Sequence, residues 1–473
     1  MKNKIYTGML LGCFLLCGCS DWLDVKPYDK ISDDELFSTE EGFQKLLNGV
    51  YVELNNDKLY GCALTVEMIE IMGGAYTIGT DNSVWGNYKD LADYQYETEY
   101  WRGRLSETWN EAYAMILNCN EILENMESRT SLFTGDNYNI IRGEALALRA
   151  MLHFDMLRLF GPVYSRNKDK LSIPYYTAQT NLPEEQLPAS EVIRKVITDL
   201  EEARILLVND PVKTEGTMMS GDVNQNSNFL CYRALRMNYY AVTALLARVY
   251  LWGNDKEAAL KEAKEIIGEA GGESPASYEL ANSAATTSDP MFNKELIFTL
   301  DVQKLKDNSD IYFTESFSST SNILTMSSKG KTNIFNGSGL DNEFRNYWIT
   351  PYSDGSSFVL KKYTGVNYIP MFKISELYLI AAECAQGKAA YDYLNKLRNH
   401  RGLSSIAPTD DLAGYIFQEY RREFIGEGQM FFYYKRKAME TIGAENNIAH
   451  QDVNAVYNLP IPTVEIDFGN IKN

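Results

Sequence analysis

The chain has 473 residues, of which 45% are hydrophobic and 12% aromatic, so it can bury a sizeable core and is not a disordered protein. Its formal net charge of −19 opposes binding to nucleic acid and to anionic membrane surfaces. The 32 tyrosines and 6 tryptophans suit either additional core or flat apolar faces that bind ligands.

The amino terminus has the order of a lipoprotein signal peptide. Lys2 and Lys4 form a basic region, and an apolar run follows over residues 5–16. That run is shorter than the roughly 20 residues that a membrane-spanning helix needs. Leu16-Cys17-Gly18-Cys19 then resembles the bacterial lipobox. We therefore expect residues 1–18 to be a signal peptide, Cys19 to carry acyl chains, and residues 19–36 to be a lipidated tether. The alternative is a plain secreted protein in which Cys19 has no role.

Apolar residues then recur every three or four positions, which predicts a series of helices. Ser38, with Glu41 three residues later, is the predicted N-cap of the first helix, which runs to residue 54. The same periodicity predicts helices over about 107–127, 138–160 and 190–207. Gly161-Pro162 ends the helix before it.

Two helical hairpins are expected in the second half of the chain. The first joins residues 241–252 to a helix capped by Asp255, and the second turns at Gly387, between residues 374–385 and 390–397. Alanines at the crossing positions are typical of tetratricopeptide-type helix pairs. A last helix is expected over about 412–437, and residues 296–302 and 358–363 are weak strand candidates.

Several of these segments also contain short sequence motifs. The order of these motifs along the chain identifies a protein family more specifically than any single motif does. The motifs are Trp109-Asn110-Glu111-Ala112-Tyr113, Arg142-Gly143-Glu144-Ala145, Ala244-Leu245-Leu246-Ala247-Arg248, Ile374-Ser375-Glu376-Leu377-Tyr378 and Leu459-Pro460-Ile461-Pro462. As an ordered set they resemble the SusD/RagB lipoproteins of the Bacteroidetes outer membrane. Gln429 and Tyr433 depart from the family pattern, in which an arginine or histidine and an aspartate are usual.

The resemblance implies an all-α, SusD-like fold with tetratricopeptide-like helix pairs, long irregular loops and minor strands. It would form a single domain over residues 37–473, with loop insertions at 61–106, 208–236 and 270–370. It also implies a non-catalytic lipoprotein, anchored on the outer membrane and exposed at the cell surface. Such a protein captures oligosaccharides or polysaccharides and delivers them to a SusC-like TonB-dependent transporter.

Three alternatives stay open: capture of peptides or glycopeptides by the same fold, a surface glycoside hydrolase, and a helical scaffold without a ligand. The sequence has no GxSxG, GxGxxG, GxxxxGK[ST] or HExxH motif. No histidine has a partner at metal-ligand spacing, so we expect no metal and no cofactor. Four cysteines follow Cys19 singly, as expected for core thiols, although a disulfide stays possible: Cys62, Cys119, Cys231 and Cys384.

The aromatic residues that helical periodicity does not claim lie in two loops, 81–101 and 312–348. Sugar rings present flat patches of C–H bonds that pack on aromatic faces. We therefore predict a glycan-stacking platform of Trp85 and Trp348, with help from Tyr88 and Tyr312. The other candidate ligand contacts are Asp81, Asn82, Tyr94, Tyr96, Trp101 and Phe313. The aspartates of the first loop do not have EF-hand spacing, and we interpret them as solvated rather than calcium-binding.

Overall fold

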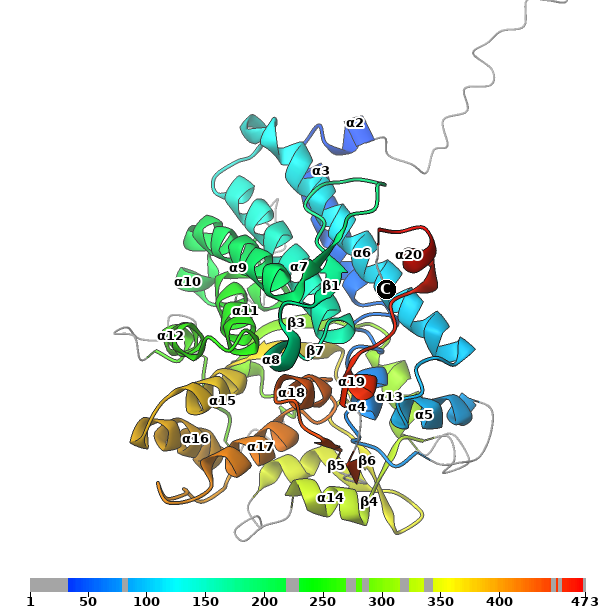
Figure 1. Cartoon of the computed structure of the whole chain (residues 1–473). Coiled ribbons are helices and arrows are strands. Elements are labelled where there is room, and N and C mark those ends of the chain that lie inside the picture. Colours follow the sequence, from blue (N-terminus) through cyan, green and yellow to red (C-terminus); the bar gives the residue numbers. More distant parts are fainter. Residues whose placement is uncertain are drawn as a thin grey trace, which may run out of the picture.

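Helices that pack on one another in chain order form the body of the protein, shown in Figure 1 as a computed structural model. The structure describes residues 33–78, 84–217, 229–268, 278–282, 289–314, 323–335, 343–443, 448–449 and 453–470. The predicted signal peptide, Cys19 and most of the predicted tether lie outside these residues.

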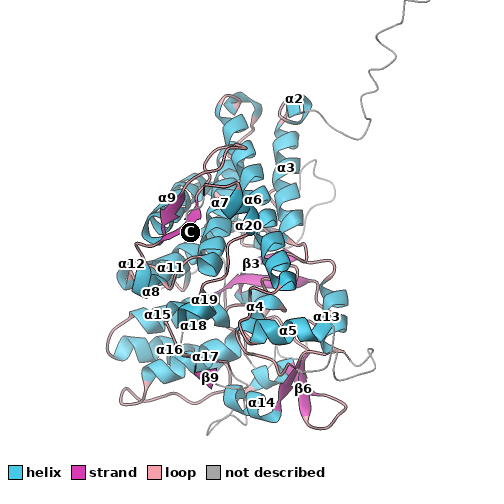
Figure 2. Ribbon diagram, turned by 45° about the vertical axis from the view of Figure 1, so that its right-hand side comes forward, coloured by secondary structure: helices cyan, strands magenta, loops and turns pink. Residues whose placement is uncertain are grey.

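Eight helices form a continuous stack in which each helix contacts the next (Figures 1 and 2). In order they are α3 (Glu40–Leu54), α6 (Glu99–Glu127), α7 (Asn137–Phe160), α9 (Ala189–Leu206), α11 (Tyr239–Trp252), α12 (Lys256–Ile266), α15 (Ile374–Cys384) and α16 (Lys388–His400). Their apolar stripes are buried against the neighbouring helices. The prediction of a helical body with only minor strands is confirmed.

Shorter elements surround this stack. The other helices are α2 (Asp33–Leu36), α4 (Met68–Met72), α5 (Val84–Ala92), α8 (Tyr164–Asn167), α10 (Val212–Glu215), α13 (Leu305–Phe313), α14 (Ser328–Phe335), α17 (Leu412–Glu423), α18 (Met430–Arg436), α19 (Val453–Tyr457) and α20 (Thr463–Asp467). The small antiparallel sheets pair β1 (Leu171–Pro174) with β2 (Gln186–Pro188), β3 (Leu296–Asp301) with β7 (Tyr368–Lys373), β6 (Ser357–Leu360) with both β4 (Thr325–Ser327) and β5 (Ile349–Pro351), and β8 (Thr441–Ile442) with β9 (Ile448–Ala449).

The helix boundaries differ from the prediction at three places. Helix α6 begins at Glu99 rather than near residue 107, because Trp101 and Leu105 continue its buried stripe. The helix expected over 412–437 is two helices, since the backbone at Gly426 and Gly428 has φ of +74° and +67°, where a helix cannot continue. The N-cap of α3 is Thr39, not Ser38.

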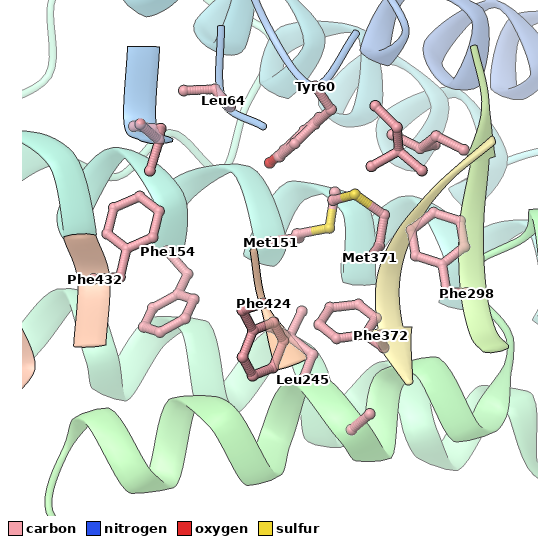
Figure 3. Packing of buried hydrophobic residues seen from close by; sticks show 14 of the residues in the cluster. Tyr60, Leu64, Met151, Phe154, Leu245, Phe298, Met371, Phe372, Phe424 and Phe432 are labelled. Carbon is pink, nitrogen blue, oxygen red and sulfur yellow. The ribbon is translucent and has the colours of Figure 1, made fainter. Parts of the chain in front are cut away.

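The strand pair β3–β7 lies at the centre of the core. Figure 3 shows Phe298 of β3 and Phe372 of β7 on neighbouring strands, with Leu245 of α11 beneath them. The two phenylalanine rings are stacked, with centroids 6.1 Å apart. The strand predicted at residues 296–302 is thus present, and it is buried on both sides by aromatic and aliphatic side chains. The four cysteines after Cys19 form no disulfide.

A buried ion network joins the carboxyl-terminal helices to the segments that precede them. At its centre is Glu423 of α17, which is fully buried. Its carboxylate accepts hydrogen bonds from Arg401 at 2.9 and 3.1 Å and from Arg345 at 2.8 Å. Burial alone would raise the pKa of Glu423, but Arg401, Lys373 and Arg345 hold that pKa well below its ordinary value. The remaining members are Glu295, Glu343, Lys362, Arg398, Glu419, Arg422 and Glu427.

We expect Glu423→Gln to destabilise the protein by about 3–5 kcal/mol, because the change removes a buried negative charge and leaves its cationic partners buried without it. Urea unfolding followed by circular dichroism measures the change. The matched control is Asp392→Asn, which breaks an exposed pair with Lys388 at 2.6 Å and should leave the unfolding midpoint unchanged. Equal midpoints for the two variants would show that the network does not contribute.

His153 lies inside α7 and has a structural role. Its Nδ1 donates to the carbonyl of Arg149 at 2.9 Å, and its Nε2 accepts from the backbone N–H of Tyr176 at 3.1 Å. The ring also stacks on Tyr175 with centroids 3.8 Å apart. Burial, with Arg149 nearby, lowers the pKa of His153 well below 6.5. The neutral ring therefore holds the segment around β1 against α7.

This depressed pKa sets the sign of a pH effect. Below pH 6.5 the unfolded chain binds a proton at His153 that the folded protein excludes, so the stabilisation by the neutral ring is present above that pH and is lost as the pH falls. We expect the unfolding free energy of the wild type to fall more steeply between pH 6.5 and 5 than that of His153→Gln. Urea titrations at half-unit pH steps measure the two slopes, and parallel slopes would contradict the assignment.

Candidate functional site

The first predicted loop folds into helices, and its partner segment comes from far along the chain. Within the stretch 61–106, α4, α5 and the start of α6 follow one another, and α13 lies beside α4 and α5 in Figures 1 and 2. The structure thus brings together the two regions in which ligand contacts were predicted. Tyr88 of α5 and Tyr312 of α13 interact through their hydroxyl groups.

A buried carboxylate organises this meeting point. Glu67 accepts hydrogen bonds from the hydroxyl of Tyr88 and from Arg104 Nη2, the latter at 2.8 Å. Cys62 Sγ lies 3.7 Å from Glu67 Oε2 and 3.6 Å from the hydroxyl of Tyr312. These five residues, called here the Glu67 cluster, connect α5, α6 and α13. Glu67 is therefore the common partner that fixes their relative positions.

The titration behaviour of the cluster follows from its burial. Burial, and then the charge of Glu67, raise the pKa of Tyr88 and of Cys62. Burial raises the pKa of Tyr312 as well, with Cys62 and Glu67 adding to the effect. For Arg104 burial lowers the pKa, but the charge of Glu67 and the hydrogen bonds to Glu67 and Tyr100 together outweigh it, and the net shift is upward. At neutral pH the tyrosines and the thiol are protonated and the guanidinium is charged, so the cluster holds no activated nucleophile.

Two partly exposed members of the cluster, Arg104 and Tyr312, and the neighbouring Tyr100 are called here the rim. Tyr100 is 38% exposed, and Arg104 and Tyr312 are half-buried. Arg104 Nη1 donates to the hydroxyl of Tyr100 at 3.3 Å, and the Tyr100 ring packs edge-on against Trp101 with centroids 5.1 Å apart. The rim therefore has one exposed aromatic ring, that of Tyr100, together with the partly exposed side chains of Arg104 and Tyr312.

Other predicted contacts are core residues, which corrects their assignment. Trp101 is 0% exposed and donates to the carbonyl of Asn87, so its ring supports Tyr88 and Tyr100 from beneath. Phe313 is buried against Tyr76, with centroids 5.8 Å apart. Tyr88 is buried as well, and its hydroxyl is held by Glu67. None of these three rings has a face that a ligand can reach.

Trp348 is the largest correction. It is 1% exposed, its Nε1 donates to the carbonyl of Pro290 at 2.7 Å, and its ring packs on Phe292 at 5.3 Å. Lys362 Nζ lies 3.8 Å from the ring centroid, which places Trp348 beside the buried ion network. The prediction that Trp348 forms an accessible stacking platform is wrong, because a ring covered on its faces by protein cannot stack on a sugar.

Tyr94 and Tyr96 fasten the connection between α5 and α6. The hydroxyl of Tyr94 donates to the carbonyl of Met72 at 3.0 Å, and that of Tyr96 to the carbonyl of Val456 at 2.7 Å. Tyr96 is buried and Tyr94 is half-buried. These contacts fix the segment between α5 and α6 and leave neither ring free to stack on a ligand. Asp81 and Asn82 lie outside the described residues, as does the side chain of Trp85.

Sequence reasoning missed Glu67, Tyr100 and Arg104. A signal for the last two was present, because Trp101, Leu105 and Trp109 recur at helical spacing and would have extended α6 towards residue 99. That extension puts Trp101 on the buried face and Tyr100 beside it. Glu67 lies between apolar residues with no periodic pattern, and only the tertiary structure reveals its partners.

The described residues include no group of histidines, cysteines and carboxylates that could hold a metal ion. In the part of the chain that the structure describes, no helix is both long and apolar enough to cross a membrane. The chemistry available at the rim is hydrogen bonding and stacking.

Two family models match most of the chain. One, described as "Starch-binding associating with outer membrane", matches residues 21–220, and the model of the SusD family matches residues 301–467. The chain belongs to the SusD/RagB family. SusD-like protein P25 of Formosa agariphila is 22% identical to it over 312 residues, or 63% of this chain. The match covers 51% of P25, so this SusD-like chain spans about half the length of that relative.

Solved structures share the SusD-like fold. A SusD superfamily protein from Bacteroides thetaiotaomicron superposes with a TM-score of 0.69 at 22% identity, covering 92% of this chain and 99% of the other. A laminarin-binding SusD-like protein superposes with a TM-score of 0.68 at 19% identity, covering 92% and 98%. These likenesses establish the fold of the SusD-like chain.

Proposed function

We propose that this SusD-like protein is a non-catalytic lipoprotein of the outer membrane that captures oligosaccharides or polysaccharides at the cell surface. The observation that carries the proposal is the rim, where two regions more than 200 residues apart in the sequence join to present Tyr100, Arg104 and Tyr312. Sugars have both apolar C–H faces and hydroxyl groups. A supported ring beside fixed donors and acceptors matches both features.

The comparisons support the same ligand class. The family description names starch binding and association with the outer membrane, and one structural neighbour binds laminarin. Both ligands are neutral glucans, which agrees with a rim whose one cation, Arg104, is neutralised by Glu67. Delivery to a SusC-like TonB-dependent transporter is a further part of the proposal, and it rests on the family to which the chain belongs.

We expect Tyr100→Ala to weaken binding of a neutral oligosaccharide about 5- to 150-fold, which corresponds to the roughly 1–3 kcal/mol of one aromatic stacking contact. Isothermal titration with maltohexaose, laminarihexaose and a mixed tetrapeptide pool measures it. Tyr347→Ala is the matched control, because Tyr347 is also 38% exposed but lies beside Trp348.

Two of the alternative functions have their own outcomes. Binding of the peptides but of no saccharide would transfer the proposal to peptide capture. Release of reducing sugar during incubation would identify a glycoside hydrolase. Equal affinities for Tyr100→Ala and Tyr347→Ala would remove the rim from the binding site.

The anchor has a separate test. We expect Cys19→Ala to leave a folded protein that is no longer retained on membranes, since two or more acyl chains on that cysteine would provide the attachment. Membrane fractionation of cells that express the wild type or the variant measures it, and a variant that still sediments with membranes would contradict the assignment.

Solubilised wild type should also co-purify with an outer-membrane barrel transporter.

A further inference from the structure

A cleft of about 1230 Å³ runs along the outer face of α3, away from the rim. Its walls are α3 and the residues that follow it to Lys58, the segment 229–236, the end of β3 with residues 303–304, and Glu111 of α6. Amide, carboxylate and aromatic side chains alternate along it. The residues that matter for its chemistry are Asn48, Tyr51, Asn55, Phe229, Tyr232 and Arg236.

Arg236 carries an unused donor in the wall of this cleft. Its side chain is sandwiched between the rings of Tyr51 and Phe229, at 4.5 and 4.7 Å from the two centroids, and the residue is only 8% exposed. Nε donates to Glu144 at 2.9 Å and Nη1 donates to Asn48. Nη2 is buried and has no hydrogen-bond partner. Because a buried donor without a partner is costly, a ligand acceptor at this position would be favoured.

Asn55 supplies the complementary group on the same wall. Its Nδ2 donates to the carbonyl of Asp301 at 2.9 Å, which fixes the orientation of the amide. The other end, Oδ1, is buried and has no hydrogen-bond partner. Turning the amide over would lose the bond to Asp301. The cleft therefore offers one fixed donor and one fixed acceptor. A hydroxyl group can pair with either, because it both donates and accepts hydrogen bonds.

Tyr232 adds an aromatic surface. The residue is 39% exposed at the cleft, and its backbone lies in the left-handed region with φ of +53°. Residues other than glycine adopt this conformation at a cost and are enriched at ligand-binding sites. Tyr232 therefore offers an accessible aromatic ring at the wall of the cleft.

The charges of the cleft disfavour a polyanion. Five carboxylates and four cationic side chains line it, and Lys45 pairs with Glu41 while Lys58 pairs with Glu111, each at 2.9 Å. Lys304 lies 3.9 Å from Asp57. No unbalanced positive charge is left to attract a sulfated or uronic-acid chain. A neutral, hydroxyl-rich ligand agrees with both the charge balance and the unpaired groups.

We propose that this cleft is a second saccharide-binding site, distinct from the rim and specific for neutral sugars. The inference rests on the proposed function only for the class of ligand, since the rim contributes none of its contacts. The two sites lie near opposite ends of α13, because Lys304 precedes that helix and Tyr312 is near its end. At 1.5 Å per residue the separation along the helix is about 12 Å.

The test uses the mature chain from residue 20 and three variants: Tyr232→Ala in the cleft, Tyr100→Ala at the rim, and Tyr347→Ala as control. Isothermal titration with maltohexaose and laminarihexaose should show binding at least about fivefold weaker for Tyr232→Ala than for the control, as for loss of one stacking contact. The double variant should bind more weakly than either single variant. Trigalacturonate should not bind in the cleft.

Crystals soaked with the same hexasaccharides locate the sugar directly. Density beside Arg236 Nη2 and Tyr232 is the expected result. If Tyr100→Ala weakens saccharide binding, Tyr232→Ala does not, and the cleft is empty in the soaked crystals, the proposal of a second site is wrong and that of the rim still holds. The reverse pattern overturns the rim alone. Occupation of the cleft by trigalacturonate but by neither neutral sugar overturns the specificity.

Discussion

The ion pairs that Arg401, Arg345 and Lys373 form with the buried carboxylate of Glu423 hold together the segments around α16, β5, β7 and α17. Arg401 at the end of α16, Arg345 ahead of β5 and Lys373 at the end of β7 all approach it in the absence of solvent. A buried charge is tolerated only when it is paired, so these segments must arrive together. When these segments pack together, they bury Trp348, and part of the predicted insertion at residues 270–370 joins the core.

The same principle operates at the rim on a smaller scale. Glu67 is buried and ties Tyr88 and Arg104 to one point, and Tyr312 joins them through Tyr88 and Cys62. These side chains are therefore already ordered in the folded protein, so ligand binding does not have to compensate for the entropy lost in ordering them. At the cleft Glu144 has the corresponding role, since it holds Arg236 in place while Nη2 stays without a hydrogen-bond partner. Both surfaces thus consist of rings and donors fixed from behind by a buried carboxylate.

Local sequence patterns predict the helices well and the ligand surface poorly, for a physical reason. The stripes of α3, α7 and α11 bury themselves in neighbouring helices, so their periodicity is visible in the sequence. Trp348 and Trp101 have polar neighbours along the chain, which suggested exposure, yet long-range partners bury both. Whether an aromatic ring is covered depends on other segments of the chain, as Pro290 and Phe292 show for Trp348 and Asn87 shows for Trp101. Arg236 and Asn55 could not be recognised for the same reason, since an unsatisfied group is defined by the partners it lacks.

Hydrogen–deuterium exchange of the mature chain, with and without a saturating neutral hexasaccharide, tests the central claim most directly because it requires no substitution. Capture at the two surfaces that flank α13 predicts slower exchange in peptides that cover residues 97–105, 229–236 and 305–314. Peptides covering residues 343–351, around the buried Trp348, should exchange at an unchanged rate. Saccharide binding that protects residues 343–351 and leaves the three flanking peptides unchanged would contradict the account.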